Sequence, residues 1–131
     1  MTRFLAAAIA LLAAAALWTP ASSSALAAGA TQTWTGIISD SHCGALHKTD
    51  IEHGGSITAR ECVIGREGDP NLPGCVSAKY GAKFVVVVGD TVYQVANQEF
   101  KALRTFAAEN VKVSGTLKGD TITVTNIIAA K

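Results

Sequence analysis

The chain has little net charge, few aromatic residues and no apolar run long enough to span a membrane. Its 131 residues include 11 Lys and Arg against 10 Asp and Glu, and 6% are aromatic. A partner bound through its phosphates needs a basic face on the protein, so this balance argues against nucleic-acid binding. A transmembrane helix needs about 20 apolar residues, and the longest apolar run, Leu5–Leu17, is shorter.

Two cysteine motifs with a defined chemistry are also missing. Thiol redox proteins carry C-x-x-C, and covalent haem attachment uses C-x-x-C-H. Cys43, Cys62 and Cys75 form neither pattern. A catalytic cysteine also needs a base held by a third group, and no such group can be identified near Cys43. We therefore expect that the protein is not an enzyme.

The first 27 residues are typical of a secretory signal peptide. Arg3 forms a basic n-region, Leu5–Leu17 an apolar h-region, and Ala25-Leu26-Ala27 a cleavage site of small residues. We predict that residues 1–27 are removed and that residues 28–131 form a single domain. That domain would be periplasmic or secreted, with no membrane span after cleavage. Loss of Arg3 leaves equal numbers of basic and acidic residues.

Five later segments show the alternating or β-branched pattern of strands: 33–39, 82–88, 91–95, 111–117 and 121–127. Gly89-Asp90, between the second and third, predicts a two-residue hairpin turn of type II′. Phe100, Leu103 and Ala107 have helical spacing and predict a helix over 99–108. Asn97 is the expected helix cap.

Residues 40–80 show no sustained period and contain both prolines of the mature part and all three histidines. Loops this long are usually functional or disordered, and the cysteines within this one favour an ordered loop. We expect one or two short helical turns in it. The order of elements predicts a mainly β fold. It would be a small OB-like five-stranded barrel with one helix between strands 3 and 4 and a long Cys/His-bearing loop between strands 1 and 2. A barrel of SH3 type and an open α+β sheet are the alternatives.

The segment from Trp34 to His47 reads W-T-G-x-I-S-D-S-x-C-G-x-x-H, and Gly81-Ala82-Lys83-Phe84-Val85 follows the last cysteine. With these motifs the chain resembles a family of small secreted bacterial proteins of unknown function that have an OB-like domain. The resemblance covers nearly the whole mature part and implies the fold, without an established activity. In that family the last two cysteines lie a few residues apart, whereas twelve residues separate Cys62 and Cys75.

Four residues of the loop are candidate metal ligands: Cys43, His47, Cys62 and Cys75. Cys43 and His47 lie four positions apart, so both would point to one side of a helical turn. Three thiolates and one imidazole make a complete tetrahedral set for zinc. Thiolates also suit Cu(I). Zinc and copper are therefore the candidate cofactors.

The cysteines also allow a structural interpretation. Cysteines of exported proteins tend to pair, and a Cys62–Cys75 disulfide would close a short loop and contribute about 2–4 kcal/mol. The third thiol and His47, with His42 or His53, could then form a weaker metal site. Asp40 directly follows a predicted strand, so we expect it to cap a turn, with metal contact as the alternative.

The sequence as a whole favours an exported binding module. Its partner would be a small ligand, a metal ion or a protein of the cell envelope. The second hypothesis is a disulfide-stapled structural or interaction domain of the envelope. A thiol-dependent enzyme is the least favoured hypothesis.

Overall fold

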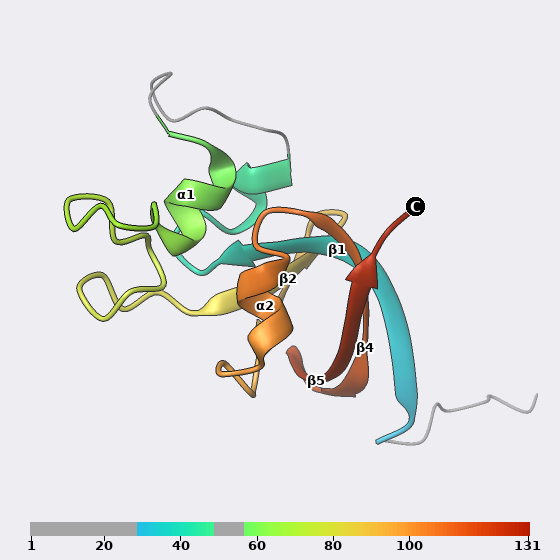
Figure 1. The fold of residues 1–131 in the computed structure, drawn as a ribbon. Coiled ribbons are helices and arrows are strands. Elements are labelled where there is room, and N and C mark those ends of the chain that lie inside the picture. Colours follow the sequence, from blue (N-terminus) through green and yellow to red (C-terminus); the bar gives the residue numbers. More distant parts are fainter. Residues whose placement is uncertain (1–28, 49–56) are drawn as a thin grey trace, which may run out of the picture.

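The computed structural model describes residues 29–48 and 57–131 and is mainly β (Figure 1). The predicted signal peptide, 1–27, lies outside these residues. The strands are β1 (Thr31–Asp40), β2 (Phe84–Val88), β3 (Thr91–Val95), β4 (Asn110–Lys118) and β5 (Thr121–Ala129). A 3-10 helix, η1 (Gly44–Lys48), and α1 (Ala59–Ile64) lie between β1 and β2, and α2 (Lys101–Thr105) lies between β3 and β4. None of the helices in these segments is long and apolar enough to cross a membrane.

The five strands form one sheet that closes into a ring in the order β1-β2-β3-β5-β4. All neighbouring strands are antiparallel except β3 and β5, which are parallel. β1 closes the ring because its first part pairs with β4 and its last part, Ile37–Asp40, pairs with β2. A side chain at Gly36 would place its Cβ 2.4 Å from the Val87 carbonyl oxygen, so only glycine fits at this junction.

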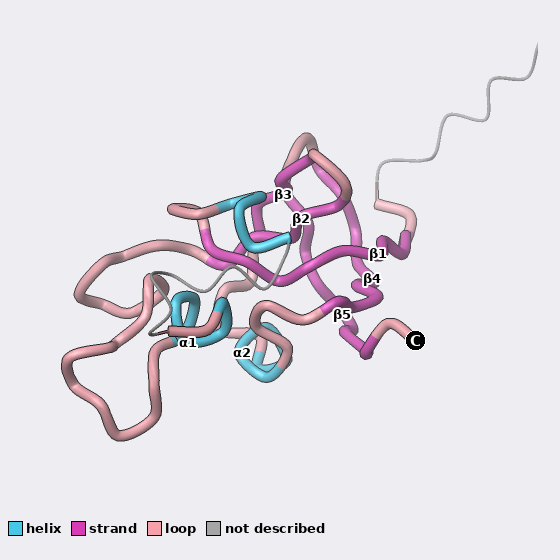
Figure 2. The backbone as a smooth tube through the Cα atoms, turned by 90° about the horizontal axis from the view of Figure 1, so that it is seen from above, coloured by secondary structure: helices cyan, strands magenta, loops and turns pink. Residues whose placement is uncertain are grey.

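The core lies inside the ring and extends under the helices. Alternate residues of β4 and β5 point inward, among them Val111, Val113 and Ile122, and are fully buried. Val63 of α1 and Leu103 of α2 join the same cluster and are also fully buried. Figure 2 shows both helices side by side outside the strands. Each helix is therefore held to the sheet by one completely buried side chain.

The strand predictions are confirmed to within a few residues, because alternation and β-branching dominate those segments. The two-residue turn is also confirmed: Val88 pairs with Thr91, and Gly89 has a φ of 58°. Asp90 is not among the residues with positive φ, which agrees with a type II′ turn.

The prediction for the helix over 99–108 is wrong in its extent and its cap. α2 covers only Lys101–Thr105, and its N-cap, Phe100, makes no side-chain capping bond. Asn97 instead pairs with the backbone of β5. Its Oδ1 accepts the Val124 N–H at 2.9 Å and its Nδ2 donates to the Val124 carbonyl at 2.8 Å. The amide thus continues the ladder between β3 and β5 where backbone pairing stops, so it is not available as a cap.

Residues 57–83 form an ordered excursion around α1. A capping box starts the helix: the Thr58 hydroxyl accepts the Glu61 N–H, and the Glu61 carboxylate accepts the Thr58 N–H. The helix ends at Gly65, and the chain turns back so that the Cys75 N–H donates to the Cys62 carbonyl at 2.8 Å. At this return the backbones of Gly65 and Gly74 touch.

A substitution at Gly74 tests how tightly the chain after α1 packs against the end of the helix. A Cβ there would lie 2.2 Å from the Gly65 nitrogen, whereas a Cβ at Gly68 would meet nothing within 4 Å. Both glycines have a φ of 78°, so Gly68→Ala is a matched control for backbone strain. We predict that Gly74→Ala lowers the free energy of unfolding by roughly 2 kcal/mol more than Gly68→Ala, measured by urea denaturation. Equal losses would show that the contact is not needed.

Candidate metal centre

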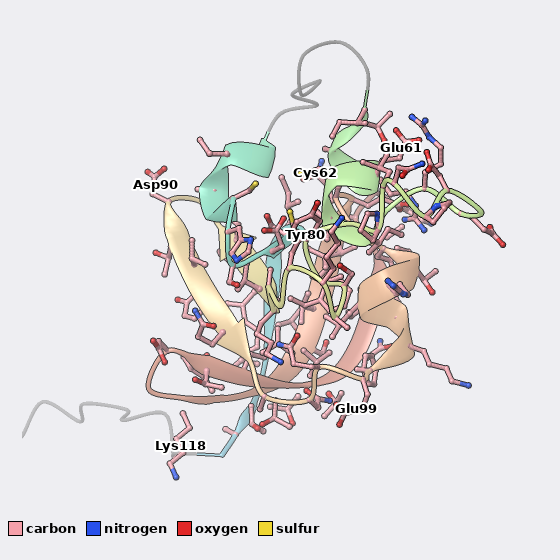
Figure 3. The ribbon with its side chains drawn as sticks, turned by 90° about the vertical axis from the view of Figure 1, so that its left-hand side faces the viewer. Glu61, Cys62, Tyr80, Asp90, Glu99 and Lys118 are labelled. Atoms are coloured by element: carbon pink, nitrogen blue, oxygen red, sulfur yellow. The ribbon has the colours of Figure 1, made fainter. Side chains whose placement is uncertain are left out.

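Four side chains converge at the C-terminal end of β1. One carboxylate oxygen of Asp40 and the Sγ atoms of Cys43, Cys62 and Cys75 all lie within 4.8 Å of one another. They come from the end of β1, the turn that follows it, α1, and the segment that leads into β2. Figure 3 labels Cys62 on α1. The cluster therefore depends on the tertiary fold, since no two of its members are adjacent in the sequence.

Asp40 fixes the turn that carries Cys43. Its side chain is fully buried, and its Oδ1 accepts the backbone N–H of His42 at 2.9 Å and that of Cys43 at 3.0 Å. The hydroxyl of Ser39, also fully buried, donates to the Gly44 carbonyl at 2.7 Å. The expectation that Asp40 caps a turn is confirmed. The same carboxylate is one of the four clustered groups, so the capping and ligand interpretations are compatible.

Cys62 and Cys75 are brought together by the backbone. In addition to the bond between them, the Val76 N–H donates to the Val63 carbonyl at 3.1 Å, and the Ala82 N–H donates to the Cys75 carbonyl at 3.0 Å. These bonds connect the end of α1 to the segment before β2. The two Sγ atoms lie 3.9 Å apart. No disulfide joins the three cysteines in the structure; Cys62 is buried, and Cys43 and Cys75 are half-buried.

Arg60 connects α1 to α2 on the side of α1 that faces away from the cysteine cluster. Its guanidinium donates to the Thr105 carbonyl at 2.8 Å and to the Arg104 carbonyl at 3.3 Å, in the last turn of α2. These carbonyls have no partner within a helix that ends there, and a cation at a helix C-terminus is favourable. α1 is thus held between the cysteine cluster and α2.

The environment of the cluster opposes ionisation of the thiols. Burial raises the pKa of Cys62, and the nearby Cys75 and Cys43 raise it further. Burial is also the main cause of the raised pKa values of Cys43 and Cys75, followed by the negative charge of Asp40. A bound cation would counter both causes, because it replaces the lost hydration and attracts the negative groups. Without a cation the three thiols therefore stay protonated, and metal binding would have to release their protons.

Three sulfur donors and one carboxylate oxygen can complete a tetrahedral zinc site. The three thiolates alone are the kind of ligand that Cu(I) prefers. The Asp40, Cys43, Cys62 and Cys75 cluster could therefore hold either metal.

The structure brings together Cys43, Cys62 and Cys75, the three cysteines that the sequence indicates as candidate ligands. His47 lies in η1, but its side chain falls outside the part that the structure describes, as does all of His53. His42 is exposed and does not belong to the cluster. From the sequence, Asp40 is predicted to cap a turn, and metal binding is only the alternative. Its position, directly after a buried strand and three residues before Cys43, was the available signal.

Comparisons with protein-family models, with curated proteins and with solved structures gave no match. The interpretation of the site therefore rests on its geometry and its donor chemistry.

Glu61 offers a test of the helix that carries Cys62. The Arg66 guanidinium, 2.6 Å away, and the Thr58 N–H lower the pKa of Glu61 to about 2. Because the folded pKa is lowered, the ionised carboxylate stabilises the fold above pH 4.5, and this contribution is lost as the pH falls towards 2. We predict that Glu61→Gln lowers Tm by a few degrees at pH 7 and has little effect near pH 2.

The measurement is thermal unfolding followed by circular dichroism across that pH range. Glu67→Gln is the control, because Glu67 is an exposed acid of the next turn with no ion pair among the described residues. An effect of Glu61→Gln that is the same at pH 7 and pH 2 would contradict the assigned role of the carboxylate.

Proposed function

We propose that the protein is an exported, non-enzymatic module that binds zinc or copper through Cys43, Cys62 and Cys75, with Asp40 as an additional ligand for zinc. The observation that carries this proposal is the approach of all four donor atoms to within 4.8 Å. A purely structural role needs only two cysteines to meet. Here a third cysteine is also present, on a turn that the buried Asp40 itself holds in place.

Export and the fold assignment belong to the same proposal. The leader-like residues 1–27 support a periplasmic or secreted location. The strand order β1-β2-β3-β5-β4, with a helix between β3 and β4, supports an OB-like barrel. The motif from Trp34 to His47, which contains Asp40 and Cys43, supports membership of the family of small secreted proteins. A metal ion is the proposed partner, ahead of a small organic ligand or an envelope protein.

The fourth ligand distinguishes the two metals. Zinc would use the Asp40 carboxylate, or the His47 imidazole in its place, to complete four-coordination. Cu(I) would be held by the three thiolates and would need neither side chain. Whichever of the two residues is the ligand, its own variant, Asp40→Asn or His47→Ala, should therefore weaken zinc binding and leave Cu(I) binding unchanged.

A disulfide between Cys62 and Cys75 is the second candidate, favoured by the 3.9 Å separation of their Sγ atoms. It would staple the return after α1 and contribute about 3 kcal/mol for a loop of this length. Cys43 would then remain as a single thiol. The protein would in that case be a stapled structural or interaction domain of the envelope.

Metal analysis of protein purified without chelators tests the proposal. We expect about one equivalent of zinc or copper per chain, with three thiols that become titratable only after chelation. Cys43→Ser should lose the metal, although Cys43 is outside the proposed disulfide. His42→Ala is the control, because His42 is exposed beside Cys43 and should retain full occupancy. A metal-free protein whose mass is two hydrogens short, with one free thiol, would overturn the metal site and support the staple.

A further inference from the structure

A cleft separate from the cysteine cluster lies between α1 and α2. Its volume is about 730 Å³, within the usual range of small-molecule sites, about 300–1,000 Å³. One wall is the end of α1 and the loop after it, the other is α2 and the residues before it, and Phe84 of β2 lies at its base. Figure 3 shows α1, the loop after it and α2 together on one side of the sheet.

The two sites use opposite faces of α1. Arg60 and Ile64 line the cleft, and residues four apart share a helix face. Cys62 lies two positions after Arg60, about 200° around the helix axis, and faces the metal centre. None of the four clustered metal-site residues lines the cleft. A ligand of the cleft would therefore not compete with a metal.

The walls of the cleft are fixed by hydrogen bonds. Arg60 joins them through its bonds to the Thr105 and Arg104 carbonyls. Gln98 anchors the second wall to β2, since its amide accepts the Phe84 N–H at 2.7 Å and donates to the Phe84 carbonyl at 3.0 Å. The first wall is closed by the Arg66 N–H, which donates to the Leu72 carbonyl at 2.9 Å. The cleft is thus formed before any ligand arrives, which lowers the entropic cost of binding.

The lining combines an apolar surface with charged side chains of both signs. Ile64, Leu72 and Phe100 are half-buried apolar residues of the two walls. Four basic residues line the cleft against two acidic ones, Glu67 and Glu99. Arg60 and Arg66 already pair with acidic residues. Neither Lys101 and Arg104 nor the two acidic residues of the lining form an ion pair within the described part of the chain. The two cations lie three positions apart in α2, which makes them neighbours on its surface.

We propose that this cleft binds a small amphipathic anion, an apolar body with a single carboxylate. The apolar body would contact Ile64, Leu72 and Phe100, and the carboxylate would lie against Lys101 and Arg104. Arginine binds carboxylates in a bidentate geometry and lysine provides a second cation. The Gln98 amide, which could otherwise bind a sugar or a peptide, is already bonded to Phe84 and Val95.

Decanoate is the probe, with decanol and decyltrimethylammonium as its neutral and cationic counterparts. Binding is measured on the whole purified chain by calorimetry and by amide shift changes in NMR. We expect decanoate to bind with the largest shifts at Leu72 and Lys101, and decanol and the cation to bind at least about tenfold more weakly. Equal affinity for decanoate and decanol, shifts centred outside the cleft, or no binding of decanoate at millimolar concentration would overturn the proposal.

Paired variants check the charge contribution. Lys101→Gln with Arg104→Gln should weaken decanoate binding about tenfold and leave decanol binding unchanged. Lys112→Gln with Lys118→Gln is the matched control, because it removes two exposed cations of β4 outside the cleft. An equal loss in both double variants would show a non-specific charge effect and contradict the proposal. Metal content should be the same in all of them, so this test is independent of the metal site.

Discussion

Ring closure by β1 is the constraint on which the rest of the structure depends. This strand pairs with β4 through its first part and with β2 through its last, and the close approach at Gly36 permits the change of partner. The part of β1 that pairs with β2 is buried, and the strand ends at Asp40, whose side chain is completely buried. A buried carboxylate needs hydrogen bonds or a cation. The turn that follows provides two N–H donors, those of His42 and Cys43, and the same turn places Cys43 in the cluster.

The excursion around α1 gives the structure two sites on one short helix. A six-residue helix is unstable by itself, and here it is supported by a capping box, by buried Val63 and by Arg60. Its inner face presents Cys62 to Cys43 and Cys75. Its opposite face forms a wall of the cleft with α2. Any change that displaces α1 should therefore disturb both the proposed metal centre and the proposed anion site.

Most of the sheet could be predicted from the sequence because strand burial leaves a local pattern. The alternation in 111–117 and 121–127 and the valines of 82–88 specify the strands, and Gly89-Asp90 specifies the hairpin. The prediction for Asn97 is wrong because the local sequence does not distinguish a helix cap from an amide that bonds to a neighbouring strand. The Thr58 and Glu61 capping box has a sequence signal, a Thr followed three residues later by a Glu. The cleft has no sequence signal at all, since it exists only where residues 60–73 meet residues 98–105.

The three cysteines can be recognised as potential ligands, together with His47, from their donor types within one loop, but their meeting cannot be deduced from their irregular spacing. It is set by the backbone bond between Cys75 and Cys62, by the glycine contact behind it and by the Asp40 turn. X-ray absorption spectroscopy of the metal-bound protein tests this account most directly. It predicts three sulfur ligands at about 2.3 Å for zinc, with one oxygen or nitrogen at about 2.0–2.2 Å. A first shell with fewer than three sulfurs would contradict the central claim that all three cysteines form one metal centre.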